Sequence, residues 1–319
     1  MKVQQLKYIA EVARCGLNIS SAAEALNTAQ PGVSNQIRLL EEELDIEIFE
    51  RKGKRLVGVT EPGRVVIQMA ERVLREMDNI RNVCREFKQT DSGTLAIATT
   101  HTQARYILPE VIKQFTQAFP KVKLRMHQGN PQQIADMVAT GVADIAIATE
   151  AIEEHEDLIM LPCYEWNRCV VAPLEHPVLS YGESLTLEQL SAYPIVTYDF
   201  AFSGRSMINQ AFDDAGLQAN VVFTAIDADV IKTYVSLGLG IGIIASMAYD
   251  ADRDHALGMV DAGKLFEPSV TRIGLRRGMF LRRYMYAFIE LFAPHLKAET
   301  VRKAMRNDSE LGERVVKSL

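Results

Sequence analysis

The stretch NISSAAEALNTAQPGVSNQIRLLEE, residues 18–42, predicts two short helices joined by a tight turn. In its first half, Asn18, Ser20 and Ser21 are candidate helix N-caps, and Ser21 and Glu24 have the spacing of a capping box. A break over residues 27–29 follows, and Pro31 then falls in the first turn of a second helix, where proline is tolerated. Two helices arranged in this way are typical of a helix-turn-helix.

The second of these helices is predicted to have one apolar and one polar face. Its apolar positions, which recur with helical spacing and should face inward, are Val33, Ile37, Leu40 and Leu44. The opposite face carries the polar side chains Gln30, Ser34, Asn35 and Arg38. Such side chains bind base edges and phosphates, so a DNA-binding helix is favoured. An ordinary helical core is the alternative for these residues taken alone.

A basic hairpin is predicted directly after the second helix. The segment FERKGKRLVGVT, residues 49–60, has a turn at Gly53 between two short runs that contain apolar residues. Such a hairpin can lie along the phosphate backbone as a wing, although a solvated loop is the alternative for an isolated charge run. The predicted DNA-binding residues of both elements are Thr28, Gln30, Pro31, Ser34, Asn35, Arg38, Arg51, Lys52, Lys54 and Arg55.

The composition indicates a folded, multidomain chain. Its 319 residues have room for two or three domains, and 48% hydrophobic residues suit sizeable cores. A net charge of -6 argues against a general polyanion binder, so any contact with nucleic acid must come from local clusters. The N-terminus reads as an amphipathic helix and not as a secretory signal, and no uncharged run is long enough for a bilayer. We therefore expect a cytoplasmic protein without a membrane partner.

The cysteines and histidines give no sign of a metal or catalytic centre. Cys15, Cys84, Cys163 and Cys169 show no CxxC or zinc spacing, which fits a reducing compartment. Cys163 and Cys169 are near neighbours, and buried free thiols are favoured over a redox switch. The histidines form no clustered ligand set, and no nucleophile or phosphate-loop motif appears. We therefore expect no metal and no catalytic residue.

A long helix is predicted between the basic hairpin and the rest of the chain. A first helix over Val3–Arg14 should pack on the helix-turn-helix, and a continuous pattern then starts at Pro62. Its apolar residues alternate in steps of four and three: Val66, Ala70, Val73, Met77, Ile80, Cys84 and Phe87. A seam of this period indicates dimerisation through a partner helix. A single long helix that packs on its own domain is the alternative.

After a polar linker at Lys88–Ser92, the pattern changes to alternating strands and helices. Strands are predicted at residues 94–99, 121–128, 143–149, 169–172, 195–198, 221–225 and 240–245, and the first intervening helices at residues 103–119 and 131–141. Alternation of this kind is typical of mostly parallel sheets, and the length suggests two small α/β lobes.

Polar residues follow several of these strands where the next helix begins. The junctions are Thr99–Gln103, Thr149–Glu150 and Phe202–Ser206. Helix N-termini present unpaired N–H donors, so hydroxyls and amides at these positions can hold a small anion. The alternative is that the hydroxyls merely cap helices.

Other protein classes fit less well. An enzyme on the same lobes needs a nucleophile, a metal set or a cofactor lysine, and the nearest candidate, Lys232, is interpreted as a structural or cleft-rim residue. A solute-binding protein would explain the lobes, but it needs an export signal and does not need residues 1–90.

The chain resembles the LysR-type transcriptional regulators along its whole length. The segments that carry the resemblance are KVQQLKYIAEV, NTAQPGVSNQIRLLEEEL, IATTHTQARYILP, DIAIATEAI, MLPCYEWNRCVV, AIDADVIKTYVSLGLGIGIIASMA and FIELFAPHL. THTQARY and DADVIKTYV are the more specific ones, and they point to the branch that governs cysteine biosynthesis and sulfur assimilation.

This resemblance implies a winged helix-turn-helix at residues 1–60 and a dimerising linker helix with a hinge at residues 61–92. It also implies a two-lobed effector-binding α/β domain at residues 93–319, similar to periplasmic binding proteins, with lobe I over about 93–165 and 268–319 and lobe II over about 166–267. Such regulators are commonly homotetramers, dimers of dimers, that bend promoter DNA. They act mainly as activators together with RNA polymerase and need no cofactor beyond a small effector.

For this branch the implied effector is N-acetylserine or O-acetylserine, with sulfate or thiosulfate able to occupy the cleft. The matching positions are Thr100, Thr102, Gln103, Thr149, Glu150, Trp166 and Ser203. Our hypothesis is that Thr100, Gln103 and Thr149 hold carboxylate or sulfate oxygens, while Trp166 forms an apolar wall. The alternative within the branch is a sulfonate-sulfur regulator that answers to another sulfur metabolite.

Five positions depart from the family pattern, among them Ala201 and Ser203. Ala29 stands where a serine usually caps the recognition helix, and Asn35 replaces a basic residue. Asp199 adds a carboxylate near the expected anion cleft, which would weaken sulfate binding if it points inward.

Overall fold

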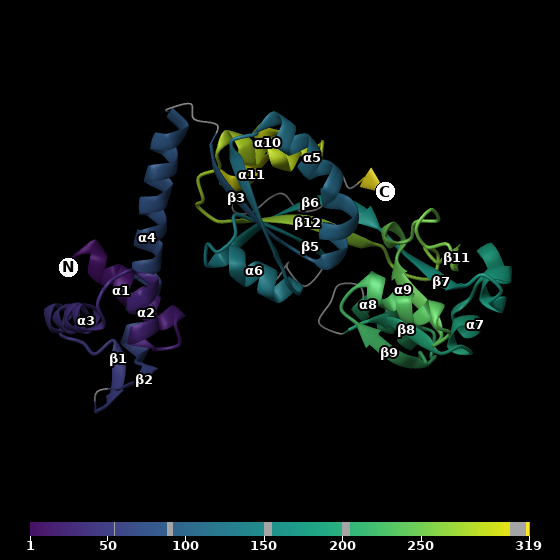
Figure 1. Ribbon diagram of the computed structural model, residues 1–319, viewed down its shortest axis with the longest axis horizontal. Helices are drawn as coiled ribbons and strands as arrows, with labels where there is room; N and C mark the ends of the chain where they lie inside the picture. The colour runs from purple at the N-terminus through teal and green to yellow at the C-terminus, as the bar shows by residue number, and fades with distance from the viewer. Residues whose placement is uncertain (54, 88–91, 150–154, 200–204, 307–316, 319) are drawn as a thin grey trace. The chain divides into compact units, whose positions relative to one another are not determined.

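The chain divides into two compact units, Met1–Gln89 and Thr90–Leu319, and each is described by itself. The structure is a computed structural model that describes residues 1–53, 55–87, 92–149, 155–199, 205–306 and 317–318 (Figure 1). Within these residues, no helix combines the length and the apolar character that crossing a bilayer requires.

The first unit is a small helical domain with a two-stranded hairpin (Figure 1). Its elements are α1 (Val3–Arg14), α2 (Ile19–Ala25), α3 (Gln30–Leu44), β1 (Phe49–Lys52), β2 (Arg55–Val59) and α4 (Glu61–Phe87). The predicted first helix, helix-turn-helix and hairpin are therefore all confirmed. The side chains of Ile9, Val12, Val33 and Leu40 are fully buried in a common core.

The cap of α2 is Asn18, one of the three predicted candidates. The side-chain carbonyl of Asn18 accepts the backbone N–H groups of Ser20 and Ser21 at 3.0 and 3.1 Å. Because Asn18 already caps the helix, Ser21 and Glu24 lie inside it and the predicted capping box is wrong.

The long helix α4 is continuous, as predicted, but its first turns belong to its own domain. Ala70 is buried and Val66 is partly buried against the core of the first unit, so Ala70 is not available to a partner helix. The predicted seam therefore needs correction at these two positions, because α1 already covers them. The predicted seam residue Cys84 is exposed. The exposed large hydrophobic residues of α4 are Val65, Met69, Val73, Ile80 and Phe87. They recur at spacings of four and seven, which places them along one side of the helix.

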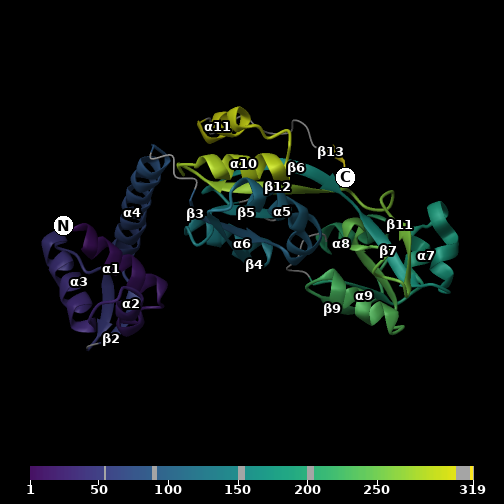
Figure 2. The same ribbon diagram turned by 45° about the horizontal axis from the view of Figure 1, so that its top comes forward.

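The second unit contains two sheets, each the centre of one lobe (Figure 2). The six-stranded sheet has the order β13-β6-β12-β5-β3-β4, and the five-stranded sheet has the order β11-β7-β10-β8-β9. The strands of the larger sheet are β3 (Gly93–Thr99), β4 (Val122–Gln128), β5 (Ile145–Thr149), β6 (Leu158–Trp166), β12 (Ser269–Arg276) and β13 (Lys317–Ser318). Those of the smaller sheet are β7 (Arg168–Pro173), β8 (Ile195–Tyr198), β9 (Val221–Ala225), β10 (Ile241–Ala245) and β11 (Leu257–Asp261).

The chain passes between the sheets twice, at Asn167 and between Asp261 and Ser269. The strands that carry it across, β7 and β12, run antiparallel to their neighbours. The sheets are therefore mixed and not mostly parallel, and β6, β11, β12 and β13 were not predicted. The two-lobed α/β architecture itself is confirmed.

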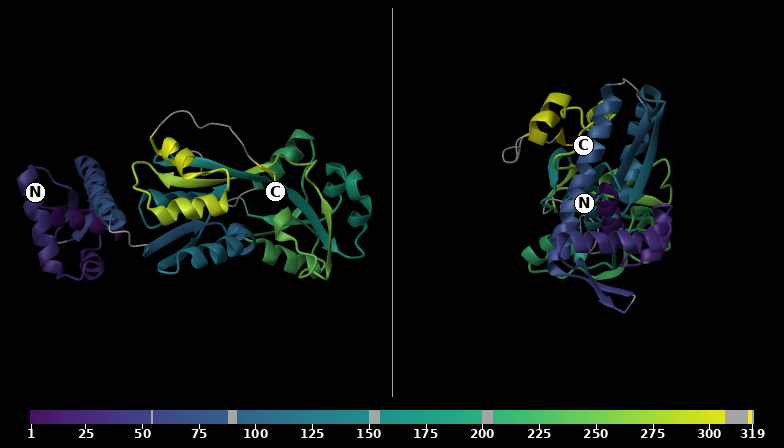
Figure 3. Two further views of the ribbon diagram at one scale, coloured as in Figure 1. Left: turned by 90° about the horizontal axis from the view of Figure 1, so that it is seen from above. Right: turned by 90° about the vertical axis from the view of Figure 1, so that its left-hand side faces the viewer.

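Helices cover both faces of each sheet. They are α5 (Leu108–Ala118), α6 (Pro131–Ala139), α7 (Leu187–Ser191), α8 (Arg205–Asp214), α9 (Ala228–Ser236), α10 (Arg283–Phe292) and α11 (Ala298–Arg306), with short helices η3 (Pro177–Ser184) and η4 (Ser246–Ala248). On β3, Leu95 and Ile97 face the core under α5 and α10, whereas Ala96 and Ala98 face α6. The helices α10 and α11, yellow in Figure 3, lie on the larger sheet although the chain has by then passed through the smaller one.

The predicted helix over residues 103–119 begins with a π-helical turn, η1 (Gln103–Ile107), before α5. Pro109 has no N–H to donate to the carbonyl of Arg105, so regular α-helical pairing is interrupted here. Single π-helical turns of this kind often occur at functional sites.

Candidate DNA-binding surface and effector pocket

The second helix of the helix-turn-helix presents the predicted polar face. Val33, Ile37 and Leu40 are buried, whereas Gln30, Asn35 and Arg38 are exposed. Ser34 is half-buried and Pro31 is exposed in the first turn. Arg38 donates to the side chain of Asn35 at 3.1 Å and also to Glu42. Asn35, which departs from the family pattern, therefore affects Arg38, because the side-chain carbonyl of Asn35 orients the guanidinium of Arg38.

The N-terminus of this helix lacks a side-chain cap. Ala29 occupies the capping position and no side chain accepts the first N–H groups, so Thr28 does not substitute for the missing serine. These N–H groups stay available to an anion such as a DNA phosphate.

The wing is fixed to α3 by Glu41. One carboxylate oxygen of this residue accepts the N–H groups of Ile48 and Phe49 at 3.0 and 3.1 Å. The other accepts a hydrogen bond from Arg51 at 2.6 Å. Arg51 therefore has a structural contact in addition to its predicted contact with DNA.

Two basic side chains of the wing share one concave surface with the helix-turn-helix. Lys52 and Arg55, paired across the hairpin, line it together with Gln30 and Ser20. Thr28 lies in a separate groove beside α1. Lys54, also predicted to contact DNA, lies outside the described residues.

We expect Lys52→Ala and Arg55→Ala each to weaken binding to a duplex that carries the target site about tenfold. Each removes one charge that we predict to contact a phosphate, so the slope of log affinity against log salt should fall by about one. Fluorescence anisotropy over a salt series measures both quantities. Lys121→Ala, an exposed lysine of the other unit, is the matched control. An unchanged salt slope in both wing variants would remove the wing from the interface.

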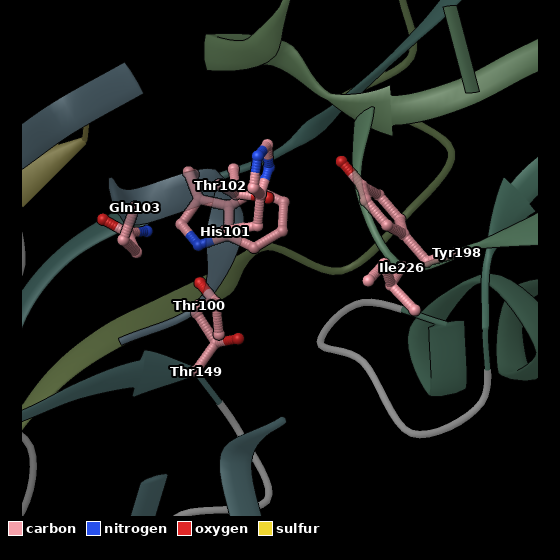
Figure 4. A pocket seen from close by; sticks show the side chains of 8 residues that line it. Thr100, His101, Thr102, Gln103, Thr149, Tyr198 and Ile226 are labelled. Carbon is pink, nitrogen blue, oxygen red and sulfur yellow. The ribbon is translucent and has the colours of Figure 1, made fainter. Parts of the chain in front are cut away.

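A pocket lies at the strand-to-helix junction after β3, between the lobes of the second unit (Figure 4). Its lining residues are Thr100, His101, Thr102, Gln103, Thr149, Trp166, Tyr198 and Ile226. The structure thus brings together Thr100, Thr102, Gln103, Thr149 and Trp166, as predicted. Glu150 and Ser203 lie outside the described residues.

His101, Tyr198 and Ile226 were not predicted as lining residues. His101 lies inside the motif THTQ, between two residues that were predicted to line the pocket. The same junction argument could therefore have included His101. Tyr198 ends β8, and its hydroxyl accepts the N–H of Ala245 at 3.2 Å. Ile226 follows β9, and nothing in the local sequence pattern indicates that either residue meets the first lobe.

The pocket contains buried polar atoms that lack partners. Thr149 Oγ1, Trp166 Nε1 and His101 Nδ1 are covered but have no hydrogen-bond partner among the described residues. An unpaired buried polar group costs about 1–3 kcal/mol, so these atoms favour a polar ligand. Because the indole N–H of Trp166 can only donate, the pocket favours a ligand with acceptor oxygens.

Asp199 does not line this pocket. Its side chain is exposed, and its backbone N–H donates to Ala225 at 3.0 Å. Burial lowers the pKa of the nearby Arg205 guanidinium, while the charge of Asp199 acts in the opposite direction. Its carboxylate is therefore placed to act on Arg205 and not on a ligand in the pocket.

An ionic contact joins the lobes beside the pocket. Asp229 at the start of α9 accepts a hydrogen bond from Tyr106 at 2.8 Å and lies 3.4 Å from Arg105 Nε. Burial acts to raise the pKa of Asp229, but the Tyr106 hydrogen bond and the charges of Lys232, Arg105 and His101 outweigh it and lower that pKa.

The same contact includes a group of possible metal ligands. His101, Asp227 and Asp229 present ligand atoms within 4.8 Å of one another. Asp227 already caps α9 by accepting the N–H of Val230 at 2.8 Å, and Asp229 is compensated by its cationic neighbours. The group is therefore better explained as an inter-lobe contact than as a metal centre.

Comparison with known proteins assigns both units. The family model described as bacterial regulatory helix-turn-helix protein, lysR family, matches residues 3–64, and the model described as LysR substrate binding domain matches residues 88–297.

Individual relatives cover nearly the whole chain. The transcriptional regulator SsuR of Burkholderia cenocepacia is 54% identical over 306 residues, which cover 96% of this chain and 99% of that protein. The regulator CysB of Haemophilus influenzae is 51% identical over 306 residues, which cover 96% and 94%. The solved cofactor-binding domain of the Cbl transcriptional regulator is 43% identical, with a TM-score of 0.65, and covers 68% of this chain and 95% of that one.

Proposed function

Because this chain belongs to the LysR family of bacterial transcriptional regulators, we propose that it controls sulfur-metabolism genes in response to a small oxyanion effector. Members of the family bind promoter DNA and small effectors and form oligomers. In this proposal the residues Gln30, Ser34, Lys52 and Arg55 contact DNA, and the effector occupies the pocket between the lobes. The chain activates transcription with RNA polymerase.

The observation that carries the effector proposal is the set of unpartnered buried polar atoms in the pocket. Thr149 Oγ1 and Trp166 Nε1 converge with the hydroxyls of Thr100 and Thr102, and no lysine or arginine lines the described part of the pocket. Neutral donors of this kind bind a carboxylate or sulfate through hydrogen bonds and the N-terminal end of a helix. Trp166 therefore offers a donor as well as the apolar wall of our hypothesis.

The first candidate effector is N-acetylserine or O-acetylserine, with sulfate and thiosulfate as competing anions. N-acetylserine combines a carboxylate with a small uncharged remainder, which suits a pocket lined by hydroxyls together with Trp166, Tyr198 and Ile226. O-acetylserine carries the same carboxylate and an ammonium group in addition. The gene targets would then be those of cysteine biosynthesis and sulfur assimilation.

A second candidate is a regulator of sulfonate-sulfur use that responds to another sulfur anion, such as adenylyl sulfate. The observation in its favour is the order of the relatives: SsuR is 54% identical, and the two CysB proteins are 51% and 46% identical. This difference in sequence identity is small, so identifying the effector is what distinguishes the two candidates.

Trp166 provides the test, because it is the single tryptophan of the chain and lines the pocket. Its fluorescence should change as either acetylserine or sulfate is titrated at constant ionic strength. We expect Thr100→Val and Gln103→Ala each to lower affinity about tenfold, since each removes one hydrogen bond to a charged ligand. Thr116→Val, on the exposed face of α5, is the control. Unchanged affinity in both pocket variants would contradict the proposed site.

For self-association, we expect Ile80→Asp to shift the full chain towards smaller species in sedimentation velocity. Ile80 is 63% exposed within the first unit, and a carboxylate there would be buried without a partner if α4 pairs with a second copy. Asn82→Asp adds the same charge on another side of α4 and should leave association unchanged. Equal sedimentation of both variants and the wild type would argue against the exposed apolar residues of α4 as the dimer contact.

A further inference from the structure

A row of polar side chains crosses the larger sheet beneath the pocket. Tyr164 on β6 is paired with Thr271 on β12, and Thr271 is paired in turn with Thr149 on β5. Directly paired residues of neighbouring strands point to the same face of a sheet. Because Thr149 lines the pocket, Tyr164 and Thr271 must lie on the pocket side of the sheet.

Gln103 forms hydrogen bonds with two residues of this row. Its amide nitrogen donates to Thr271 Oγ1 at 3.1 Å, and its amide oxygen accepts a hydrogen bond from the hydroxyl of Tyr164. Gln103 is 1% exposed and Thr271 is fully buried, so this network is shielded from water. Such shielding makes an unmade hydrogen bond expensive and keeps the network in one arrangement.

The arrangement decides which end of the amide faces the ligand. Figure 4 shows the nitrogen of Gln103 on the side of the other lining residues and the oxygen on the far side. The nitrogen carries two N–H groups, of which Thr271 takes one. Among the described residues the second N–H has no acceptor and remains for a ligand, whereas the oxygen is held by Tyr164.

We propose that Tyr164, together with Thr271, is a positioning residue that holds the Gln103 amide with an N–H towards the pocket. This inference rests on the proposed function, because it concerns the same effector site. Its consequence is specificity: with the oxygen held away, Gln103 and Trp166 both present donors. The pocket then selects an effector whose bound end carries acceptors alone, a carboxylate or a sulfate. An ammonium group, which carries donors alone, meets donor against donor, and a neutral hydroxyl or amide offers a weaker acceptor than a charged carboxylate or sulfate oxygen.

The chemistry of Tyr164 suits this role. Burial raises the pKa of its phenol, so the hydroxyl keeps its proton at neutral pH and remains able to donate. The ring itself packs against Phe292 with centroids 5.7 Å apart, which fixes the position of the hydroxyl. Phenylalanine at position 164 would keep this packing and remove only the donor.

A double-mutant cycle on the full-length chain tests the proposal, with sulfate as the probe and Trp166 fluorescence as the readout. We expect Tyr164→Phe to weaken sulfate binding roughly fivefold, because the amide can then turn its oxygen to the pocket. In a Gln103→Ala background the same substitution should change affinity by less than about twofold, since nothing is left to position. Thr271→Val removes the other hydrogen-bond partner of Gln103 and should also weaken sulfate binding. This variant provides the test if Tyr164→Phe does not fold.

The outcomes separate this inference from the proposed function. Unchanged sulfate affinity in both Tyr164→Phe and Thr271→Val would overturn the inference. An equal loss in the wild-type and Gln103→Ala backgrounds would overturn it too, because Tyr164 would then act by another route. If the wild-type chain bound none of sulfate, thiosulfate, the two acetylserines and adenylyl sulfate, the proposed function would fail, and this inference with it.

Discussion

Replacing Lys232 by methionine is expected to lower the free energy of unfolding of the second unit by about 3–5 kcal/mol, the usual cost of breaking a buried ion pair. The side chain of Lys232 is 9% exposed and its ammonium lies 2.9 Å from Asp254, whose side chain is 12% exposed. It also donates to the carbonyl of Ala248 at 2.8 Å. Methionine fills the space of the stem but leaves the carboxylate without its charge partner.

Urea unfolding followed by circular dichroism measures this loss. Lys121→Met, which removes an exposed lysine, is the matched control and should stay within about 0.5 kcal/mol of the wild type. Adding Asp254→Asn to Lys232→Met should recover part of the stability, because the buried charge is then gone. Wild-type stability in Lys232→Met would show that Lys232 is not a structural residue.

Gln103→Glu is expected to lower sulfate affinity by roughly a thousandfold. The hydroxyls of Tyr164 and Thr271 can both donate to a carboxylate, so the buried network has partners in the variant. The pocket, however, gains a negative charge about 4 Å from the anion, and two such charges repel by about 4 kcal/mol at an effective dielectric constant of about 20. Titration by Trp166 fluorescence measures the change.

The control for this variant is Gln117→Glu, which adds the same charge on the exposed face of α5. It should leave the affinity within about twofold of the wild type at physiological salt, because exposed charges are screened. A Gln103→Glu variant that still binds sulfate like the wild type would mean that the anion lies elsewhere.

The first unit could be predicted almost completely from the sequence, because its signals are local. Helical spacing placed Val33, Ile37 and Leu40 inward, and the turn at Gly53 set the hairpin. The seam on α4 was less predictable. Periodicity identifies an apolar face, but it cannot tell whether α1 or a second copy covers Val66 and Ala70.

The pocket could be predicted in part, because Thr100, Thr102 and Gln103 stand together in one motif. Tyr198, Ile226 and Thr271 come from strands far apart in the chain, and only the two passages between the sheets bring them to Thr149. The sequence pattern alone also gave no reason to expect antiparallel strands. β7 and β12 run antiparallel to their neighbours because the chain enters the sheet from the other lobe at these strands, and no local pattern encodes that passage. The positioning role that we propose for Tyr164 depends on this strand register.

The central claim is that an acetylserine or a sulfur-containing anion binds in the pocket between the lobes. The most direct measurement is calorimetric titration of the full-length chain with O-acetylserine, N-acetylserine, sulfate, thiosulfate and adenylyl sulfate, each repeated with Gln103→Glu. The account predicts that at least one of these five compounds binds the wild type and that Gln103→Glu abolishes its binding. Preference for an acetylserine favours the cysteine regulator, and preference for adenylyl sulfate favours the sulfonate regulator. Absence of binding to all five compounds, or binding that is retained in Gln103→Glu, would contradict the account.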